Sequence, residues 1–249
     1  MLKYQQHKQE NIAYFVLIMG SHKYKPTVSD EYAGKLRQWQ DNVYNDLKQQ
    51  STQIIEFLGL RLTVPPKVHP VNPMSDLLGN SVLREVKETD SVLDMGTGCG
   101  VNAILAASQS KKVIAVDINP EAIKAAEKNA RANGTEKIVF KVSDVFSEVK
   151  ESFDLILFDP PFRWFAPRDI YEISTTDEGY RSLRTFFSEV NDYLNPDGRI
   201  LLCFGSSGDL NYLYQLIEQH GFKKEIIVQK SLEKEGIKVA YFTFRLTRK

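Results

Sequence analysis

The sequence of 249 residues has few cysteines, no excess of charge of either sign and no long apolar run. Its two cysteines, Cys99 and Cys203, lie far apart, which argues against the disulfide framework of small secreted proteins. The apolar stretch at residues 12–20 falls well short of the ~20 residues of a membrane-spanning helix. It also lacks the cleavage site of a secretory signal. We therefore expect a protein of the reducing cytoplasm without a membrane span.

Charge is balanced, since Lys and Arg together number 32 and Asp and Glu together also number 32. A strong nucleic-acid binder usually carries a basic excess, so this balance disfavours that class. Basic residues do gather near the C-terminus: Lys223, Lys224, Lys230, Lys234, Lys238, Arg245, Arg248 and Lys249. Lysines in such a segment are typical of a protected edge strand, and a contact with RNA is left open.

Metal-ligand spacing, internal repeats and heptad patterns are also lacking. The four histidines and two cysteines are scattered, so we expect no catalytic metal. No internal repeat is visible, and the sequence leaves the oligomeric state open. What is present is an apolar content of 42% with 26% charged residues. This composition is typical of a globular domain with a sizeable core.

The first 64 residues differ from the rest and predict a small helical region, a candidate for substrate recognition. We expect helices over residues 5–19 and 29–58, with Ser29 as the N-cap of the second. Apolar residues recur in the second stretch at spacings near three and four: Tyr32, Leu36, Trp39, Val43, Leu47, Ile54, Phe57 and Leu58. A strand at residues 60–64 and two prolines follow. We place a domain boundary between residues 64 and 65.

From residue 74 onward, strands and helices alternate. We expect strands at residues 91–95, 112–117, 137–142, 153–158, 199–204, 224–229 and 238–246. Helices are predicted at residues 74–86, 101–109, 120–132, 179–194 and 209–220. This alternation predicts an α/β fold, a Rossmann-like, doubly wound sheet of seven mostly parallel strands. The last two strands have no helix between them, so they should form an antiparallel hairpin.

A glycine-rich loop, Asp94-Met-Gly-Thr-Gly-Cys-Gly100, joins the first core strand to the next helix. This place in a doubly wound sheet is the usual ligand crevice. Its spacing differs from the G-x-G-x-x-G of dinucleotide-binding loops. Because Asp94 would repel a pyrophosphate, the loop favours a ligand with an ammonium group, such as S-adenosylmethionine, over NAD. The candidate cofactor contacts are Asp94, Gly96, Thr97, Gly98 and Gly100.

Two further acids follow the next two strands. Asp117 ends the second strand, where its carboxylate can accept both hydroxyls of a ribose and Ile118 can flank the base. Asp144, followed by Val145, comes after the third strand and can reach the exocyclic amine of adenine. One acid at a strand end is often only a helix cap. Three acids at the carboxyl ends of three successive strands instead indicate a site for an adenosine-bearing cofactor.

The segment Asp159-Pro160-Pro161-Phe162 follows the strand at residues 153–158. Two prolines fix φ and remove two N–H donors, so they hold the chain extended. The Asp159 carboxylate and the Pro160 carbonyl can then accept the two N–H groups of an amide or an exocyclic amine. Phe162 can stack on that planar acceptor. The alternative is a rigid turn, but the position after a fourth strand end favours a catalytic clamp, which would also border the cofactor through Asp159.

Residues near this clamp are weaker candidates for binding the methyl acceptor. Trp164, Phe165 and Arg168 follow it directly and can line a pocket by stacking or cation–π contact, although packing of a long loop explains them equally well. His69 precedes a proline at the expected mouth of the crevice. It is either a contact to cofactor or acceptor, or an ordinary loop histidine.

Together these motifs resemble the class I methyltransferases, in particular the small-domain group that carries Asn/Asp-Pro-Pro-Tyr/Phe. The resemblance covers roughly residues 65–249. It implies that Asp94, Gly96, Gly98 and Gly100 form the cofactor loop, that Asp117 binds ribose and that Asp144 lies beside adenine. It also implies that Asp159 begins the acceptor clamp.

Within that group the chain is similar to the HemK/PrmC-type glutamine methyltransferases. Those enzymes have a helical N-terminal domain and a Pro-Arg-Pro-Glu-Thr-Glu-like segment, whose latter part aligns with residues 72–78. This chain departs from them in having Asp159 where they use Asn, Phe162 where they use Tyr, and Asn72 at the arginine. The acceptor is therefore open between a protein glutamine, an RNA base and a small amine.

The leading hypothesis is an S-adenosylmethionine-dependent N-methyltransferase. An NAD-dependent oxidoreductase is the alternative from another class, and the spacing of the glycine loop argues against it. An inactive cofactor-binding subunit of a methyltransferase complex is the third possibility. The intact motifs argue against it.

Overall fold

The computed structural model describes residues 24–72, 74–135, 137–234 and 236–249. The helix predicted over residues 5–19 lies outside the described residues. Within these ranges, no helix is both long and apolar enough to cross a membrane.

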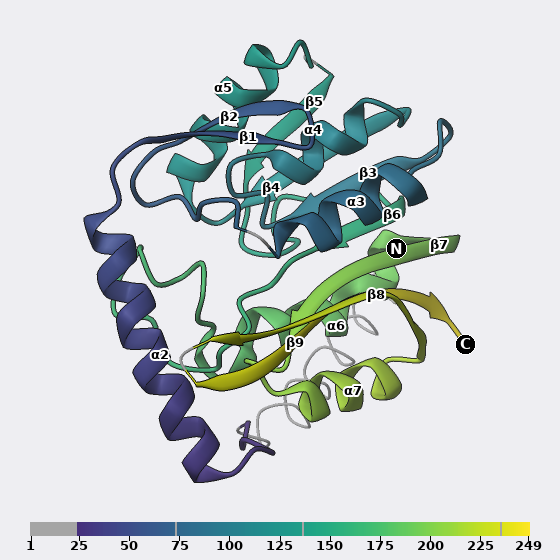
Figure 1. Cartoon of the computed structure of the whole chain (residues 1–249). Coiled ribbons are helices and arrows are strands. Elements are labelled where there is room, and N and C mark those ends of the chain that lie inside the picture. The colour runs from purple at the N-terminus through teal and green to yellow at the C-terminus, as the bar shows by residue number, and fades with distance from the viewer. Residues whose placement is uncertain (1–23, 73, 136, 235) are drawn as a thin grey trace, which may run out of the picture.

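The core is a seven-stranded sheet with the order β5-β4-β3-β6-β7-β9-β8 (Figure 1). Its parallel strands are β3 (Ser91–Met95), β4 (Lys112–Asp117), β5 (Ile138–Val142), β6 (Phe153–Phe158) and β7 (Leu194–Gly205). β9 (Ile237–Arg248) runs antiparallel to both β7 and β8 (Phe222–Lys234). The predicted doubly wound fold with its C-terminal hairpin is confirmed, and the hairpin strands are longer than predicted.

The strand order brings two motifs that are far apart in the sequence side by side. From β3 the chain moves outward through β4 to β5, and it then returns to add β6 on the other side of β3. Ligands bind at such a switch point, beyond the carboxyl ends of the strands. Met95 of β3 pairs with Phe158 of β6. The glycine loop and the Asp159 clamp therefore begin at adjacent positions on one edge of the sheet.

Helices cover both faces of the sheet because successive strand residues point to opposite sides. Leu93 and Ile156 join a core cluster on the face of α6 and α7, whereas Val92 and Leu155 join the cluster on the other face. The second face holds α3, α4 and α5. The bounds of these helices are α3 (Ser75–Glu85), α4 (Val101–Ala107), α5 (Pro120–Ala132), α6 (Arg181–Tyr193) and α7 (Leu210–Gln219). A short 3₁₀ turn, η1 (Glu178–Tyr180), precedes α6.

The N-terminal region departs from the prediction. Helix α2 (Asp30–Gln49) begins after the predicted cap, Ser29, but the helical prediction for residues 50–58 is wrong. The chain forms instead an antiparallel hairpin of β1 (Gln53–Phe57) and β2 (Leu60–Val64). Its two turn residues, Leu58 and Gly59, both have positive φ, as a tight primed hairpin turn requires.

Tertiary contacts explain why the hairpin forms. The Asn129 side chain of α5 accepts from the Thr63 N–H at 2.8 Å and donates to the Thr63 carbonyl at 3.1 Å. Asn133 makes the same pair of bonds to the backbone of Arg61. The two asparagine side chains thus make the hydrogen bonds to β2 that a neighbouring strand would make. The hairpin contacts the sheet domain closely, and the boundary between residues 64 and 65 stays a prediction.

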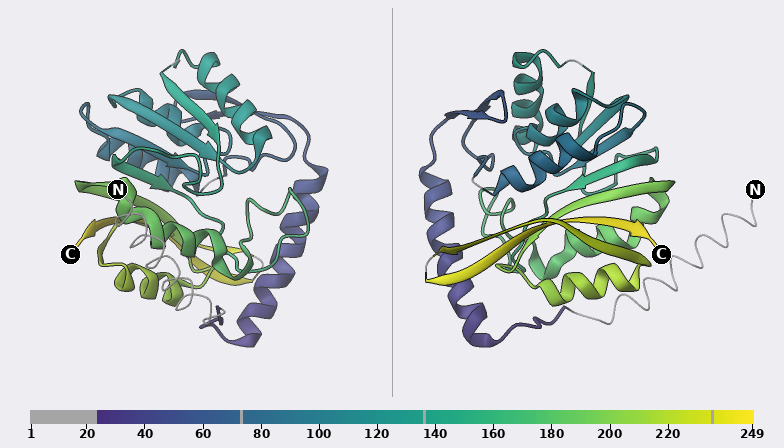
Figure 2. Two further views of the ribbon diagram at one scale, coloured as in Figure 1. Left: turned by 180° about the vertical axis from the view of Figure 1, so that it is seen from behind. Right: turned by 45° about the vertical axis from the view of Figure 1, so that its right-hand side comes forward.

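Helix α2 runs along one side of the molecule, below the β1–β2 hairpin and past the ends of β8 and β9 (Figure 2). Its apolar stripe includes Leu36 and Trp39, which are buried in the same core cluster as α6 and α7. The helix is therefore packed against the body of the protein.

Candidate functional site

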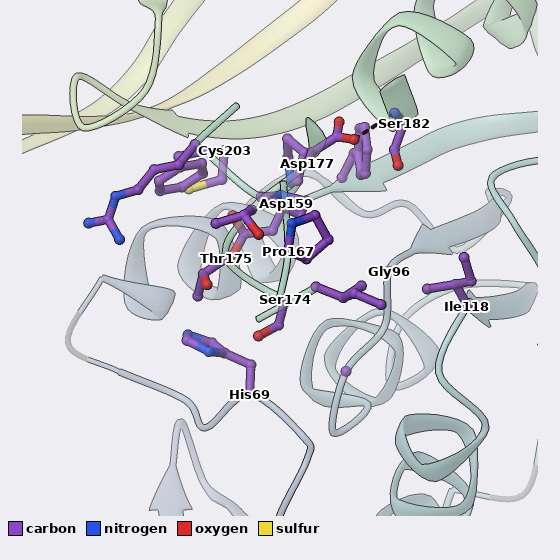
Figure 3. Close-up of a pocket in the computed structure, with 18 of the residues that line it drawn as sticks. His69, Gly96, Ile118, Asp159, Pro167, Ser174, Thr175, Asp177, Ser182 and Cys203 are labelled. Carbon is purple, nitrogen blue, oxygen red and sulfur yellow. Dashed lines mark hydrogen bonds between the residues drawn. The ribbon is translucent and has the colours of Figure 1, made fainter. Parts of the chain in front are cut away.

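A cavity of about 1140 Å³ opens at the carboxyl ends of β3, β4, β5 and β6. Trp39 and Val43 of α2, residues 67–72, 74 and 75, and the long loop after β6 complete its walls. In Figure 3, Gly96 and Ile118 lie on one side of Asp159, whereas His69, Thr175 and Cys203 lie on the other. We call the first side the cofactor half and the second the acceptor half.

The glycine loop presents backbone to the cofactor half. Gly96, Gly98 and Gly100 have φ values of 72°, 56° and 89°, in the region that favours glycine. A Cβ at Gly96 or Gly98 would meet nothing within 4 Å, and both residues line the cavity. A Cβ at Gly100 would come within 2.9 Å of Ala126 Cβ. Gly100 therefore serves the packing of α4 on α5, away from the cavity.

Asp94 holds the loop together from beneath. Its carboxylate accepts the Thr97 hydroxyl at 2.6 Å and the Ala103 N–H at 3.1 Å. Burial raises the pKa of Asp94 to about 6, partly opposed by these bonds. Asp94 is 2% exposed and does not line the cavity, whereas Thr97 does.

Asp117 joins the loop to the end of β4. Its two carboxylate oxygens accept the N–H groups of Gly98 at 2.9 Å and Asn119 at 2.8 Å. Burial raises the pKa of Asp117 above its usual value. Ile118 is 41% exposed beside it and lines the cavity. Asn102, which the sequence did not single out, also lines this half, and its buried Oδ1 has no hydrogen-bond partner.

Asp144 lies at the cavity wall but is already paired. Both of its oxygens accept from the Arg181 guanidinium at 2.9 Å, as a bidentate ion pair. Val145 follows in a left-handed conformation, with a φ of 48°, and is buried. The structure thus places both predicted residues at the cavity together with Arg181, which is a third residue that sequence reasoning missed.

Asp159 lies between the two halves. Asp159 is exposed to the cavity, and protein atoms enclose it on its other sides. Burial raises the pKa of Asp159 to about 7, opposed by a hydrogen bond from the Cys203 thiol and reinforced by the charge of Asp94. Both cysteines are unpaired and buried.

The rest of the clamp lines the same cavity. Pro160, Pro161 and Phe162 all face it. The Phe162 carbonyl accepts the Tyr180 hydroxyl at 2.6 Å, and that hydroxyl accepts the Asp209 N–H at 2.7 Å. The clamp is therefore fixed from behind by a buried tyrosine.

The weaker candidates divide into two groups. His69 and Trp164 line the cavity, and the buried Nδ1 of His69 has no hydrogen-bond partner. Phe165 and Arg168 do not line it. The Phe165 ring lies under the Arg37 guanidinium, 4.2 Å away. Arg168 pairs with Asp41 at 2.9 Å and Glu172 at 2.6 Å. Both contribute to docking of α2, the packing role that was the alternative for them, and their contact with the acceptor stays a prediction.

A network between α2 and the loop after β6 was missed entirely. Gln40 donates to Glu172 and to Thr175, at 2.9 Å each, and accepts from Arg163. The Arg163 guanidinium lies 4.3 Å from the centre of the Trp39 ring. These partners are more than 120 residues apart in the sequence, so no local pattern could have revealed them.

Among the residues that the structure describes, no group of three or more His, Cys, Asp or Glu side chains is placed to hold a metal ion. The expectation of metal-free chemistry stays a prediction.

Comparison with known proteins adds a family. Residues 71–230 match the family described as "Methyltransferase small domain". A putative protein N5-glutamine methyltransferase of Methanocaldococcus jannaschii is 34% identical over 194 residues, which cover 75% of this chain and 96% of that protein. The release factor glutamine methyltransferase of Streptococcus pneumoniae is 32% identical over 166 residues, or 60% of this chain. The match spans 58% of that longer relative.

A solved structure agrees in fold. The crystal structure of a ribosomal protein L11 methylase from Lactobacillus delbrueckii subsp. bulgaricus superposes with a TM-score of 0.56 and 23% identity. The match covers 75% of this chain and 84% of that one. At this identity the likeness supports the fold alone.

Proposed function

This chain belongs to the methyltransferase small domain family, and we propose that its cavity holds S-adenosylmethionine beside a planar amide nitrogen of a glutamine-type acceptor. The predicted class of activity, S-adenosylmethionine-dependent N-methylation, is confirmed by the family match and the relatives. It replaces the two alternatives, an NAD-dependent oxidoreductase and an inactive subunit. The observation that carries the proposal is the adjacency of the glycine loop and the Asp159 clamp across β3 and β6.

The cofactor half fits S-adenosylmethionine in shape and chemistry. Open space in front of Gly96 and Gly98 leaves room for a ligand against bare backbone. The unpartnered Asn102 Oδ1 is an acceptor suited to the ammonium group of a methionine moiety. At the adenosine end, Asp117 and Ile118 would border the ribose and base, with Val145 and the Asp144–Arg181 pair beside them. Asp94 and Thr97 would act by holding the loop in shape.

The acceptor half would orient a nitrogen. The Asp159 carboxylate and the Pro160 carbonyl accept its two N–H groups, and Phe162 packs against its planar group. When bound, the cofactor supplies a sulfonium methyl group as the electrophile. Two N–H contacts turn the nitrogen lone pair towards that methyl group, and positioning of this kind can contribute about 7–11 kcal/mol. Asp159, with its pKa of about 7, is suited to receive the proton that the methylated nitrogen loses.

The glutamine-type amide is proposed because two relatives are named as glutamine methyltransferases. A primary amide offers two N–H groups in one plane, which matches two converging acceptors. The cysteines form no disulfide, which fits a reducing compartment. We therefore include a cytoplasmic location in the proposal.

The test is transfer of labelled methyl groups into extract from a strain that lacks the protein, followed by fractionation into protein, RNA and small molecules. We expect label in the protein or the small-molecule fraction. This label should resist alkaline ester hydrolysis and map to an amide nitrogen. Label confined to RNA would replace the acceptor class. Absence of label from every fraction, with cofactor bound, would contradict the proposal.

A further inference from the structure

The loop after the clamp holds a buried cation without an acidic partner. Arg163 follows Phe162 directly, is 6% exposed and lines the acceptor half. Its Nη1 donates to the Gln40 side-chain carbonyl, and its Nε has no hydrogen-bond partner. Glu172 is the carboxylate whose charge acts on Arg163, but it accepts hydrogen bonds from the Arg168 guanidinium at 2.6 Å and 2.9 Å. The guanidinium is therefore left without a direct counter-charge among the described residues.

Such a charge is costly to bury. An ionised group taken out of water needs pairing and hydrogen bonds to offset its lost hydration. Arg163 has one neutral amide bond and one ring contact, to Trp39 at 4.3 Å, and a cation–π contact supplies only part of that compensation. Burial accordingly lowers the pKa of Arg163 to about 10. The group still stays charged at neutral pH, so the folded protein keeps an unmatched positive charge at the cavity wall.

A second buried nitrogen without a hydrogen-bond partner lies in the same cavity. His69 also lines the acceptor half, and its buried Nδ1 has no partner. Burial, reinforced by the positive charge of Arg163, lowers the pKa of His69 to about 4, so the imidazole is neutral and carries one N–H. The Lys234 ammonium approaches the same Trp39 ring, 5.6 Å from its centre. This side of the cavity thus combines two cations with an unpartnered imidazole nitrogen, which can donate to an anion when it carries the proton.

We propose that Arg163 and His69 form an oxyanion subsite, which binds a carboxylate or phosphate group carried by the methyl acceptor. A planar guanidinium matches such an oxygen pair well. An acceptor that brings an anion would supply the missing counter-charge, and it would be oriented by that anion at one end and by the Asp159 clamp at the other. The link to the acceptor rests on the proposed function, whereas the binding of an oxyanion does not.

A purely structural role for Arg163 predicts different behaviour. If the side chain only tied α2 to the loop through Gln40 and Trp39, its loss would lower stability and would not affect a charged probe more than a neutral one. The discriminating quantity is therefore the ratio of the affinities for two probes that differ in one charge.

The experiment uses the full chain saturated with S-adenosylhomocysteine, titrated in a calorimeter. The carboxylate probe is glutaramate, which has a primary amide and one carboxylate. Its neutral counterpart is glutaramide, and inorganic phosphate is the probe for the phosphate source. The variant is Arg163→Gln. The matched control is Arg37→Gln, which removes a guanidinium that also lies over a ring in the α2 interface, 4.2 Å from Phe165, but outside the cavity lining.

We expect the wild-type protein to bind glutaramate, phosphate or both at least about tenfold more tightly than glutaramide, the range of a charge-assisted hydrogen bond. Arg163→Gln should remove that preference, and Arg37→Gln should keep it. The anion that binds more tightly shows whether the acceptor carries a carboxylate or a phosphate group. Equal affinity of the wild-type protein for all three probes would overturn the proposal without any variant, so a failure of Arg163→Gln to fold leaves it testable. A preference that survives in a folded Arg163→Gln would also overturn it.

These titrations need no turnover. Failure of methyl transfer to every nitrogen acceptor would remove the proposed function and leave the oxyanion subsite in place. Conversely, methyl transfer to a neutral amide with no preference for anions would retain the function and remove the subsite.

Discussion

The two halves of the cavity are built in different ways. The cofactor half is made of backbone at strand ends, from a loop whose residues are close in sequence and whose acids bond neighbouring N–H groups. The acceptor half is made of side chains that meet from α2, the segment after β2, the loop after β6 and β9. The first half is thus set by local sequence, and the second by tertiary contacts.

This difference predicts how each half responds to change. A loop fixed by its own backbone bonds should be disturbed only by substitutions that add atoms or strain within it. A wall of side chains should respond to substitutions at a distance, because each member is held by partners elsewhere in the chain, as Phe162 is by Tyr180.

The largest effect is expected at the boundary between the halves. Asp159→Ala should lower turnover about 100- to 1000-fold, since it removes a contact aimed at the reacting nitrogen, and should affect cofactor affinity much less. Turnover and calorimetric binding are measured on the same preparation.

The matched control is Asp154→Asn, at the other end of β6, where Asp154 bonds Ser91 at 2.8 Å. It should reduce stability and leave turnover per folded molecule unchanged. Wild-type turnover in Asp159→Ala would remove the clamp from the site.

The next effect isolates the cofactor half. Gly98→Ala should weaken binding of S-adenosylmethionine roughly tenfold, because a methyl group would occupy space in front of the loop. Gly134→Ala is the control, since Gly134 also has a positive φ, 69°, and open space for a Cβ, but lies outside the cavity lining. Both variants should lose about 1 kcal/mol of stability from backbone strain, as thermal unfolding would measure. Equal affinities in the two variants would contradict the assignment of the loop.

The pH dependence tests the electrostatics of Asp159. Because its pKa is raised to about 7, the carboxylate is progressively protonated as the pH falls through 7 and stops being an acceptor at both oxygens. We expect kcat/KM to fall about tenfold per pH unit below 7 and to level off above it. Asp159→Asn should have lower activity with no such limb. The same limb in the Asn variant would assign the titration to another group.

The smallest effect concerns the support behind the clamp. Tyr180→Phe removes the hydroxyl that bonds the Phe162 carbonyl and the Asp209 N–H. We expect a loss of about 1–2 kcal/mol of unfolding free energy and a several-fold lower kcat, with unchanged cofactor affinity. Tyr214→Phe is the control, because that hydroxyl has no hydrogen bond to a described residue. A kcat unaffected by Tyr180→Phe would show that the clamp holds its shape unaided.

Sequence predicted the parts of the fold that depend on local pattern. Alternating apolar strands and capped helices located all seven strands of the sheet, and the glycine loop and Asp159 clamp fell on the edge where the strand order brings them together. The helical prediction at residues 50–58 failed because Ile54 and Phe57 suit a helical stripe as well as a strand. Asn129 of α5 and Asn133, which caps that helix, decide in favour of the hairpin.

The acceptor half was largely beyond such reasoning. Arg163 and Arg168 cannot be told apart by residue type or by their position in the loop. Arg163 lines the cavity, whereas Arg168 pairs with Asp41 and Glu172 at the α2 interface. The cofactor half has one such exception: Arg181 gave no signal as the partner of Asp144, because their bond joins residues 37 positions apart. Only the three-dimensional arrangement separates these roles.

The most direct test of the account is calorimetric titration of the folded protein with S-adenosylmethionine and, separately, with NAD. We predict saturable binding of S-adenosylmethionine, one molecule per chain, and no heat with NAD. Binding of NAD alone, or no binding of S-adenosylmethionine by protein whose circular dichroism shows an intact fold, would contradict the central claim that the loop from Asp94 to Gly100 is a methyl-donor site.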